Sequence, residues 1–71
     1  MDYQQLISAV RAVTGDEEFT FGASGWKSDG TPLAYCFSFR SSQTAEAAFA
    51  RLKELDAAVV RQGVRELLVR L

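Results

Sequence analysis

Residues 19–39 have the sequence FTFGASGWKSDGTPLAYCFSF, and this stretch decides the fold. Bulky and small side chains alternate from Phe19 to Ser24 and again from Leu33 to Arg40. A period of two that is rich in aromatic residues predicts two antiparallel strands with one buried face. Between them, Asp29-Gly30 is a strong turn pair, and Pro32 fits only at the rim of a ladder because it has no N–H. The stretch therefore predicts a β-hairpin.

The hairpin also contains the nearest approach to a chemical motif, GASGWKSDG at residues 22–30. A phosphate-binding loop has the pattern G-x-x-x-x-G-K-S/T and leads from a strand into the N-terminus of a helix. Here Trp26 separates Gly25 from Lys27, and the stretch connects a strand to a strand. The motif fails in both spacing and setting, so no nucleotide or other cofactor is expected.

The alternation sorts the hairpin side chains into two faces. The apolar set is expected to lie buried under helices: Phe19, Phe21, Leu33, Tyr35, Phe37 and Phe39. The opposite face carries small, uncharged side chains and one large aromatic: Thr20, Gly22, Ser24, Trp26, Ala34, Cys36 and Ser38. Charges usually discourage unwanted docking on a sheet, and Trp is enriched at binding hot spots. The predicted partner-binding residues are therefore Trp26, Lys27, Ser24, Ala34, Cys36 and Ser38. The alternative is that small residues simply coat an exposed sheet, with Trp26 folded over its edge.

A helix precedes the hairpin. Apolar residues from Tyr3 to Val13 are spaced by three or four positions, which predicts a helix of about twelve residues. Asp2 and Gln5 have the spacing of a capping box, and Gly15 supplies a left-handed exit.

A second helix is predicted after Ser41 or Ser42, and Gly63 ends or interrupts it. Its apolar stripe consists of Ala45, Ala48, Phe49, Leu52, Leu55 and Val59. The final stretch, residues 64–71, is ambiguous because VRELLVRL fits both a helical spacing and a strand alternation. We favour a strand, since a two-stranded hairpin alone is marginal in water.

The predicted fold class is α+β, with the element order α-β-β-α-β. It comprises a small mixed three-stranded sheet, made of the hairpin and the C-terminal strand, with two helices on one face. The second helix is then a right-handed crossover between parallel strands. Residues 1–71 are predicted to form a single compact domain. The alternative is a helical C-terminal segment.

Composition excludes several classes of function. The 71-residue chain has one cysteine, Cys36, and no histidine, which removes internal disulfides, the usual zinc sites and histidine-based catalytic triads. Small secreted domains are dense in disulfides, so a cytoplasmic setting is expected. No apolar run approaches the roughly 20 residues that span a bilayer. The acids Asp16, Glu17 and Glu18 are adjacent and predict a solvated corner, since so small a fold has little material to enclose a pocket.

These observations favour a non-enzymatic module that binds another protein, with no metal, cofactor or membrane. Its size suits an adaptor, or an inhibitor of the kind that phages and other mobile elements carry. A second hypothesis is a nucleic-acid-associated protein that uses Arg61, Arg65 and Arg70, although interleaved acids make nucleic acid a less favoured partner. A third is a structural homo-oligomer, in which the C-terminal strand lies at a sheet edge and pairs with its copy.

Overall fold

The computed structural model of the chain describes residues 2–70 and has two helices and four strands. In chain order these are α1 (Tyr3–Thr14), β1 (Phe19–Trp26), β2 (Pro32–Phe39), α2 (Ser42–Glu54), β3 (Ala58–Arg61) and β4 (Glu66–Arg70). The prediction of an α+β fold with two helices is confirmed.

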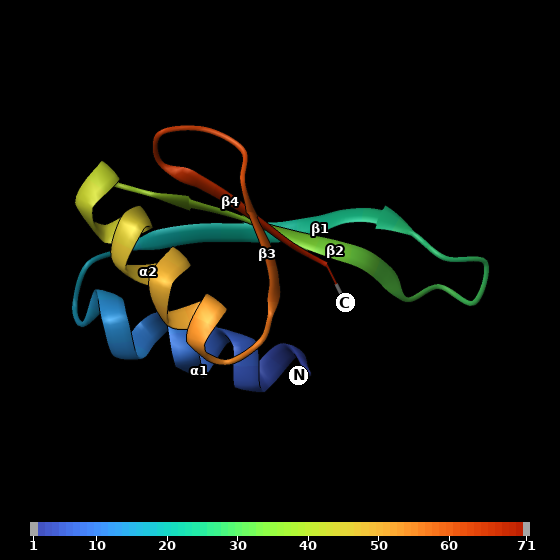
Figure 1. Cartoon of the computed structure of the whole chain (residues 1–71). Helices are drawn as coiled ribbons and strands as arrows, with labels where there is room; N and C mark the ends of the chain where they lie inside the picture. Colours follow the sequence, from blue (N-terminus) through green and yellow to red (C-terminus); the bar gives the residue numbers. More distant parts are fainter. Residues whose placement is uncertain (1, 71) are drawn as a thin grey trace.

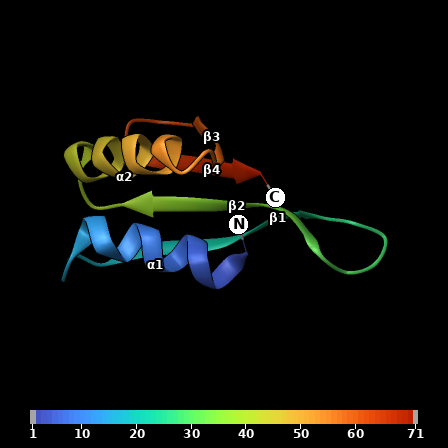
Figure 2. The same ribbon diagram turned by 60° about the horizontal axis from the view of Figure 1, so that its bottom comes forward.

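The four strands form one sheet in the order β1-β2-β4-β3, and every neighbouring pair is antiparallel. Both helices cover the same face of this sheet, and the other face is left open (Figures 1 and 2). The predicted three-stranded mixed sheet was wrong in two respects: residues 58–61 form a fourth strand, and no strand pair is parallel. The C-terminal segment is a strand rather than a helix, as favoured, although Leu71 lies outside the described residues.

The fourth strand arises because α2 ends earlier than its apolar stripe predicts. Asp56 adopts a left-handed backbone conformation with φ of 60°. Its N–H donates to the carbonyl of Lys53 at 3.1 Å, and the N–H of Ala57 donates to the carbonyl of Leu52 at 2.9 Å. These two bonds form a Schellman motif, which terminates a helix. Val59 therefore lies in a new strand, β3, instead of extending the helix, and Gly63 lies in the β3–β4 turn.

The predicted N-terminal helix is confirmed together with its caps. The side chain of Asp2 accepts the N–H of Gln5, and the side chain of Gln5 accepts the N–H of Asp2, at 2.8 and 3.0 Å. Gly15 takes φ of 62°, and its N–H donates to the carbonyl of Arg11. These local bonds fix both ends of α1 and so set which of its faces meets the sheet.

The hydrophobic core lies between the helices and the inner face of the sheet. Its buried members are Leu6, Val10, Phe37, Phe39, Ala45, Ala48, Leu52, Val59, Leu67 and Val69. The hairpin of β1 and β2 runs beyond the ends of the helices, as Figure 2 shows. Leu33, which was predicted to be buried, lies in this extension and is exposed, and Tyr35 is only partly buried. Phe21 was also predicted to be buried, but it lies on the edge strand β1 and is exposed, and Phe19 on the same strand is only partly buried.

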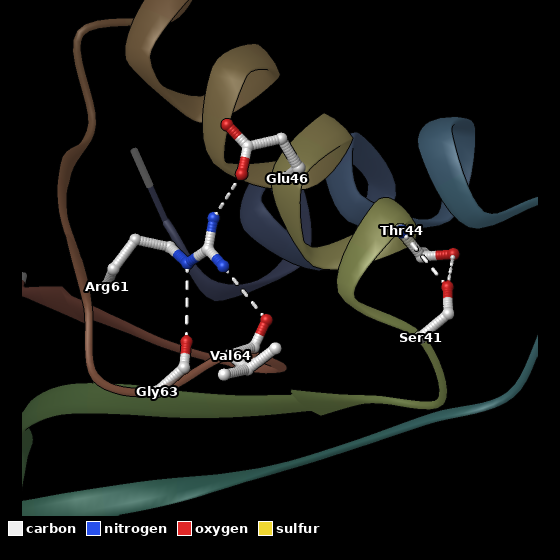
Figure 3. Close-up of polar contacts among 6 residues, drawn as sticks. All are labelled: Ser41, Thr44, Glu46, Arg61, Gly63 and Val64. Carbon is white, nitrogen blue, oxygen red and sulfur yellow. Dashed lines mark hydrogen bonds and ion pairs between the residues drawn. The ribbon is translucent and has the colours of Figure 1, made fainter.

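Arg61 fastens the β3–β4 turn to α2. Its guanidinium forms an ion pair with Glu46 at 2.6 Å and donates to the carbonyls of Gly63 and Val64 at 3.3 and 2.9 Å (Figure 3). The start of α2 is capped separately, because the Ser41 hydroxyl accepts the N–H of Thr44. The short β3–β4 hairpin is thereby held against the helix layer.

Candidate functional site: the outer face of the sheet

The open face of the sheet, here called the outer face, presents its side chains in rows that cross all four strands. The strand register defines a middle row of Gly22, Cys36, Leu68 and Val60. On the side nearer the hairpin tip lies a row of Ser24, Ala34, Arg70 and Ala58. On the other side lie Thr20, Ser38 and Glu66, with Gln62 opposite Glu66 through a backbone bond of 3.0 Å. The middle row carries no charge.

The structure brings four of the predicted partner-binding residues onto this face. Ser24, Ala34, Cys36 and Ser38 all lie on the outer side of β1 or β2, in adjacent rows. Ala34 is nevertheless only 5% exposed, so its methyl group forms part of the floor rather than a projecting contact. A partner of this face would therefore contact the side chains around Ala34 rather than Ala34 itself.

Trp26 lies at the far end of the outer face. It is opposite Pro32 in the register and is 64% exposed. Gly25, directly before it, has φ of 77°, and a Cβ there would lie 2.9 Å from Cδ1 of Leu33. Leu33 therefore packs on a bare stretch of backbone, and the positive φ at Gly25 favours glycine.

The hairpin tip beyond Trp26 is a three-residue loop, residues 28–30, that is closed by hydrogen bonds of the residues beside it. The N–H of Lys27 donates to the carbonyl of Thr31 at 2.8 Å, and Gly30, with φ of 88°, donates to the carbonyl of Lys27. The carboxylate of Asp29 accepts the hydroxyl and the N–H of Thr31 at 2.7 and 3.0 Å. The side-chain hydrogen bond from Thr31 lowers the pKa of Asp29 from its ordinary value of 3.8. The tip is thus internally bonded and joins two strands, as predicted for this stretch.

A hollow of about 320 Å³ lies on the outer face beside the middle row. Its lining includes Thr20, Gly22, Cys36, Ser38, Gln62 and Glu66. A Cβ added at Gly22 would meet nothing within 4 Å, so the missing side chain helps to form the hollow. The thiol of Cys36 donates to Oε1 of Gln62 at 3.6 Å, which draws Gln62 across β4.

Sequence reasoning missed half of the outer face. Val60, Glu66, Leu68 and Arg70 belong to it, but residues 58–61 had been predicted to continue the second helix. The adjacent β-branched residues Val59 and Val60, followed by Gly63 and an alternating stretch, are the signal that indicates a hairpin here.

The three arginines proposed as a basic surface lie in separate places. Arg61 is engaged with Glu46 and two carbonyls, whereas Arg70 is on the outer face. Arg65 lines a different groove at the C-terminal end of α1. The fold therefore does not assemble them into one continuous basic patch.

That groove has a volume of about 660 Å³, and it carries charges of both signs. Its charged lining residues are Arg11, Asp16, Glu17, Glu18, Arg40 and Arg65. It is larger than the sequence led us to expect of so small a fold, but it is open to solvent. Oε2 of Glu17 accepts the Thr44 hydroxyl at 2.8 Å, and Arg11 lies over the Phe19 ring. Within residues 2–70, no group of three or more His, Cys, Asp or Glu side chains is placed to hold a metal ion.

Comparisons of the chain with models of protein families, with curated proteins and with solved structures find no match. In the part of the chain that the structure describes, no helix is long and apolar enough to cross a membrane.

Proposed function

We propose that this chain is a non-enzymatic protein-interaction module of the cytoplasm, an adaptor or an inhibitor, that binds a protein partner through its outer sheet face and hairpin. The observation that carries the proposal is the placement of Trp26. A large aromatic side chain, 64% exposed, stands at the end of a hairpin that projects beyond the helix layer (Figure 1). Tryptophan buries a large apolar area on binding at a low cost in conformational entropy.

The composition of the outer face also supports the proposal. The middle row of the outer face is uncharged, and Val60 within it is 49% exposed. Depletion of charge at the centre, with polar groups at the margin, is the pattern of protein–protein interfaces. Covering this row requires little desolvation of charged groups, which favours association.

The rigidity of the hairpin also supports the proposal. The Asp29–Thr31 and Lys27–Thr31 bonds hold the tip in one conformation. A surface that is ordered before binding loses less conformational entropy when a partner arrives. Trp26, the last residue of β1, lies directly before this closed tip.

The proposal is tested by capturing partners from the source cell's lysate with the wild-type chain, with Trp26→Ala and with Val64→Ala. Val64 is a matched control, because it is 69% exposed but lies in the β3–β4 turn, away from the hairpin. A protein retained by the wild type and by Val64→Ala, and lost with Trp26→Ala, is the expected result. The same set of proteins with all three chains, or none with any, would overturn the assignment of Trp26.

A further inference from the structure

The outward side chains of β4 have a pattern that is complementary to itself when reversed. Glu66, Leu68 and Arg70 are two residues apart and lie on the outer face, so acid, apolar and base follow one another along the strand. Within residues 2–70, neither Glu66 nor Arg70 forms an ion pair. Leu68 lies between Cys36 and Val60 in the uncharged middle row.

We propose that the partner of the outer face is a second copy of this chain, packed face to face about a twofold axis along the middle row. A twofold axis in that direction lays β4 over β4 of the second copy and reverses it. Glu66 then faces Arg70 of the second copy, Arg70 faces Glu66 of the second copy, and Leu68 and Val60 each meet their own copies. The interface is isologous, as in most homodimers.

The charges select this axis over the alternative. A twofold axis parallel to the strands and passing over β4 would place Glu66 against Glu66 and Arg70 against Arg70 of the second copy. Like charges placed opposite one another across an interface are costly. The axis along the middle row converts both contacts into opposite-charge pairs and keeps the uncharged residues at the centre.

Face-to-face packing also suits the size of the chain and the shape of the sheet. A chain of 71 residues buries a smaller share of its surface than a larger domain does, so association adds needed apolar burial. Two sheets pack face to face at about 10 Å, with their inward side chains forming a core. Trp26 lies beyond the rows near the centre, at the hairpin end.

This inference rests on the proposed function, since it names the partner of the same face, and charge reversal tests it. The molar mass of four samples is measured by sedimentation at a low and a high concentration: wild type, Glu66→Arg, Arg70→Glu, and an equimolar mixture of the two variants. We expect the wild type to reach twice the chain mass of 7.8 kDa. Each variant alone places like charges opposite one another and should dissociate on the order of 10-fold more readily or beyond.

The equimolar mixture is the decisive sample. In a heterodimer of the two variants, every contact between positions 66 and 70 again pairs an acid with a base. The mixture should therefore regain the mass of a dimer, which no general loss of solubility or folding would produce. A mixture that stays monomeric while the wild type dimerises would overturn the proposed axis.

Three further checks keep the inference falsifiable. Circular dichroism checks that each variant is folded, and Val60→Lys offers a second break, because it places two positive charges on the axis at an exposed edge-strand position. Cys36 lies in the middle row, so a short bismaleimide should link two wild-type chains through their single cysteines. A monomeric wild type, or a dimer unaffected by all three substitutions, would overturn the inference and leave the Trp26 capture experiment as a separate test of the proposed function.

Discussion

Leu67 and Leu68 are neighbours in β4, yet they lie in two different regions of the molecule. Leu67 points to the inner face, is 0% exposed and packs in the core with Phe37. Leu68 points to the outer face, is partly buried and lies between Cys36 and Val60. Because the side-chain period of a strand is two, one strand contributes to the stability of the fold and to an open surface at the same time.

The largest expected difference between the two faces is in stability. Truncating a fully buried Leu to Ala removes apolar burial and leaves a cavity, so Leu67→Ala should lower the free energy of unfolding by about 3 kcal/mol. Leu68→Ala should cost about 1 kcal/mol or less at a concentration where the chain is monomeric, because its environment can relax into solvent. Urea denaturation of the two variants and the wild type measures both values. Equal losses would mean that the outer face is as tightly packed as the core.

A smaller loss of stability is expected from a substitution at Gly25, near the end of the hairpin. Gly25→Ala requires a left-handed backbone at a residue with a Cβ, which costs about 1–2 kcal/mol, and it displaces Leu33. Gly22→Ala is the matched control, because Gly22 has open space around its Cα and no positive φ. Denaturation followed by the fluorescence of Trp26, the only tryptophan, reports both. A Gly22→Ala variant that is the less stable of the two would contradict this description of the hairpin.

The smallest expected effect is the change in stability with pH that arises at the hairpin tip, beyond both faces of the sheet. Because hydrogen bonds from Thr31 lower the pKa of Asp29, the folded carboxylate binds its proton less readily than the unfolded one. Its contribution to stability is therefore present above the ordinary value of 3.8 and is lost as the pH falls through the lowered pKa. An NMR titration of the Thr31 amide should show a midpoint below 3.8, and Asp29→Asn should abolish the transition. A midpoint at or above 3.8 would contradict the bonding at the tip.

The first half of the fold was predictable because its signals are local. The Asp2–Gln5 capping box, Gly15 and the alternation across residues 19–39 each depend on short-range geometry, and the structure has the helix and the hairpin that they predict. The second half was predicted only in part. Its helix and its C-terminal strand are present, but α2 ends at Glu54 because Asp56 takes a left-handed conformation, which this residue type seldom does. The apolar residues from Ala45 to Val59 have helical spacing throughout. That spacing does not reveal that Val59 lies in a strand.

The candidate site was likewise predictable only in the part that lies on β1 and β2. The outer-face residues of β1 and β2 follow from alternation, so Ser24, Cys36 and Ser38 were placed together from the sequence alone. The residues of β3 and β4 could not join them until the β3–β4 hairpin was known. The predicted pairing of the C-terminal strand with its copy at a sheet edge was also wrong, since β4 lies between β2 and β3 and both of its edges are occupied.

The outer face is proposed to bind a second copy of the chain, while the inner face holds the fold together. The most direct test is a methyl NMR spectrum of the wild-type chain recorded at high and at low concentration. If the outer face packs against a second copy, dilution should shift the methyl signals of Val60 and Leu68 and leave those of Leu6 and Leu67 unchanged. Shifts confined to the helix side, or no shift at any concentration, would contradict the proposed dimer.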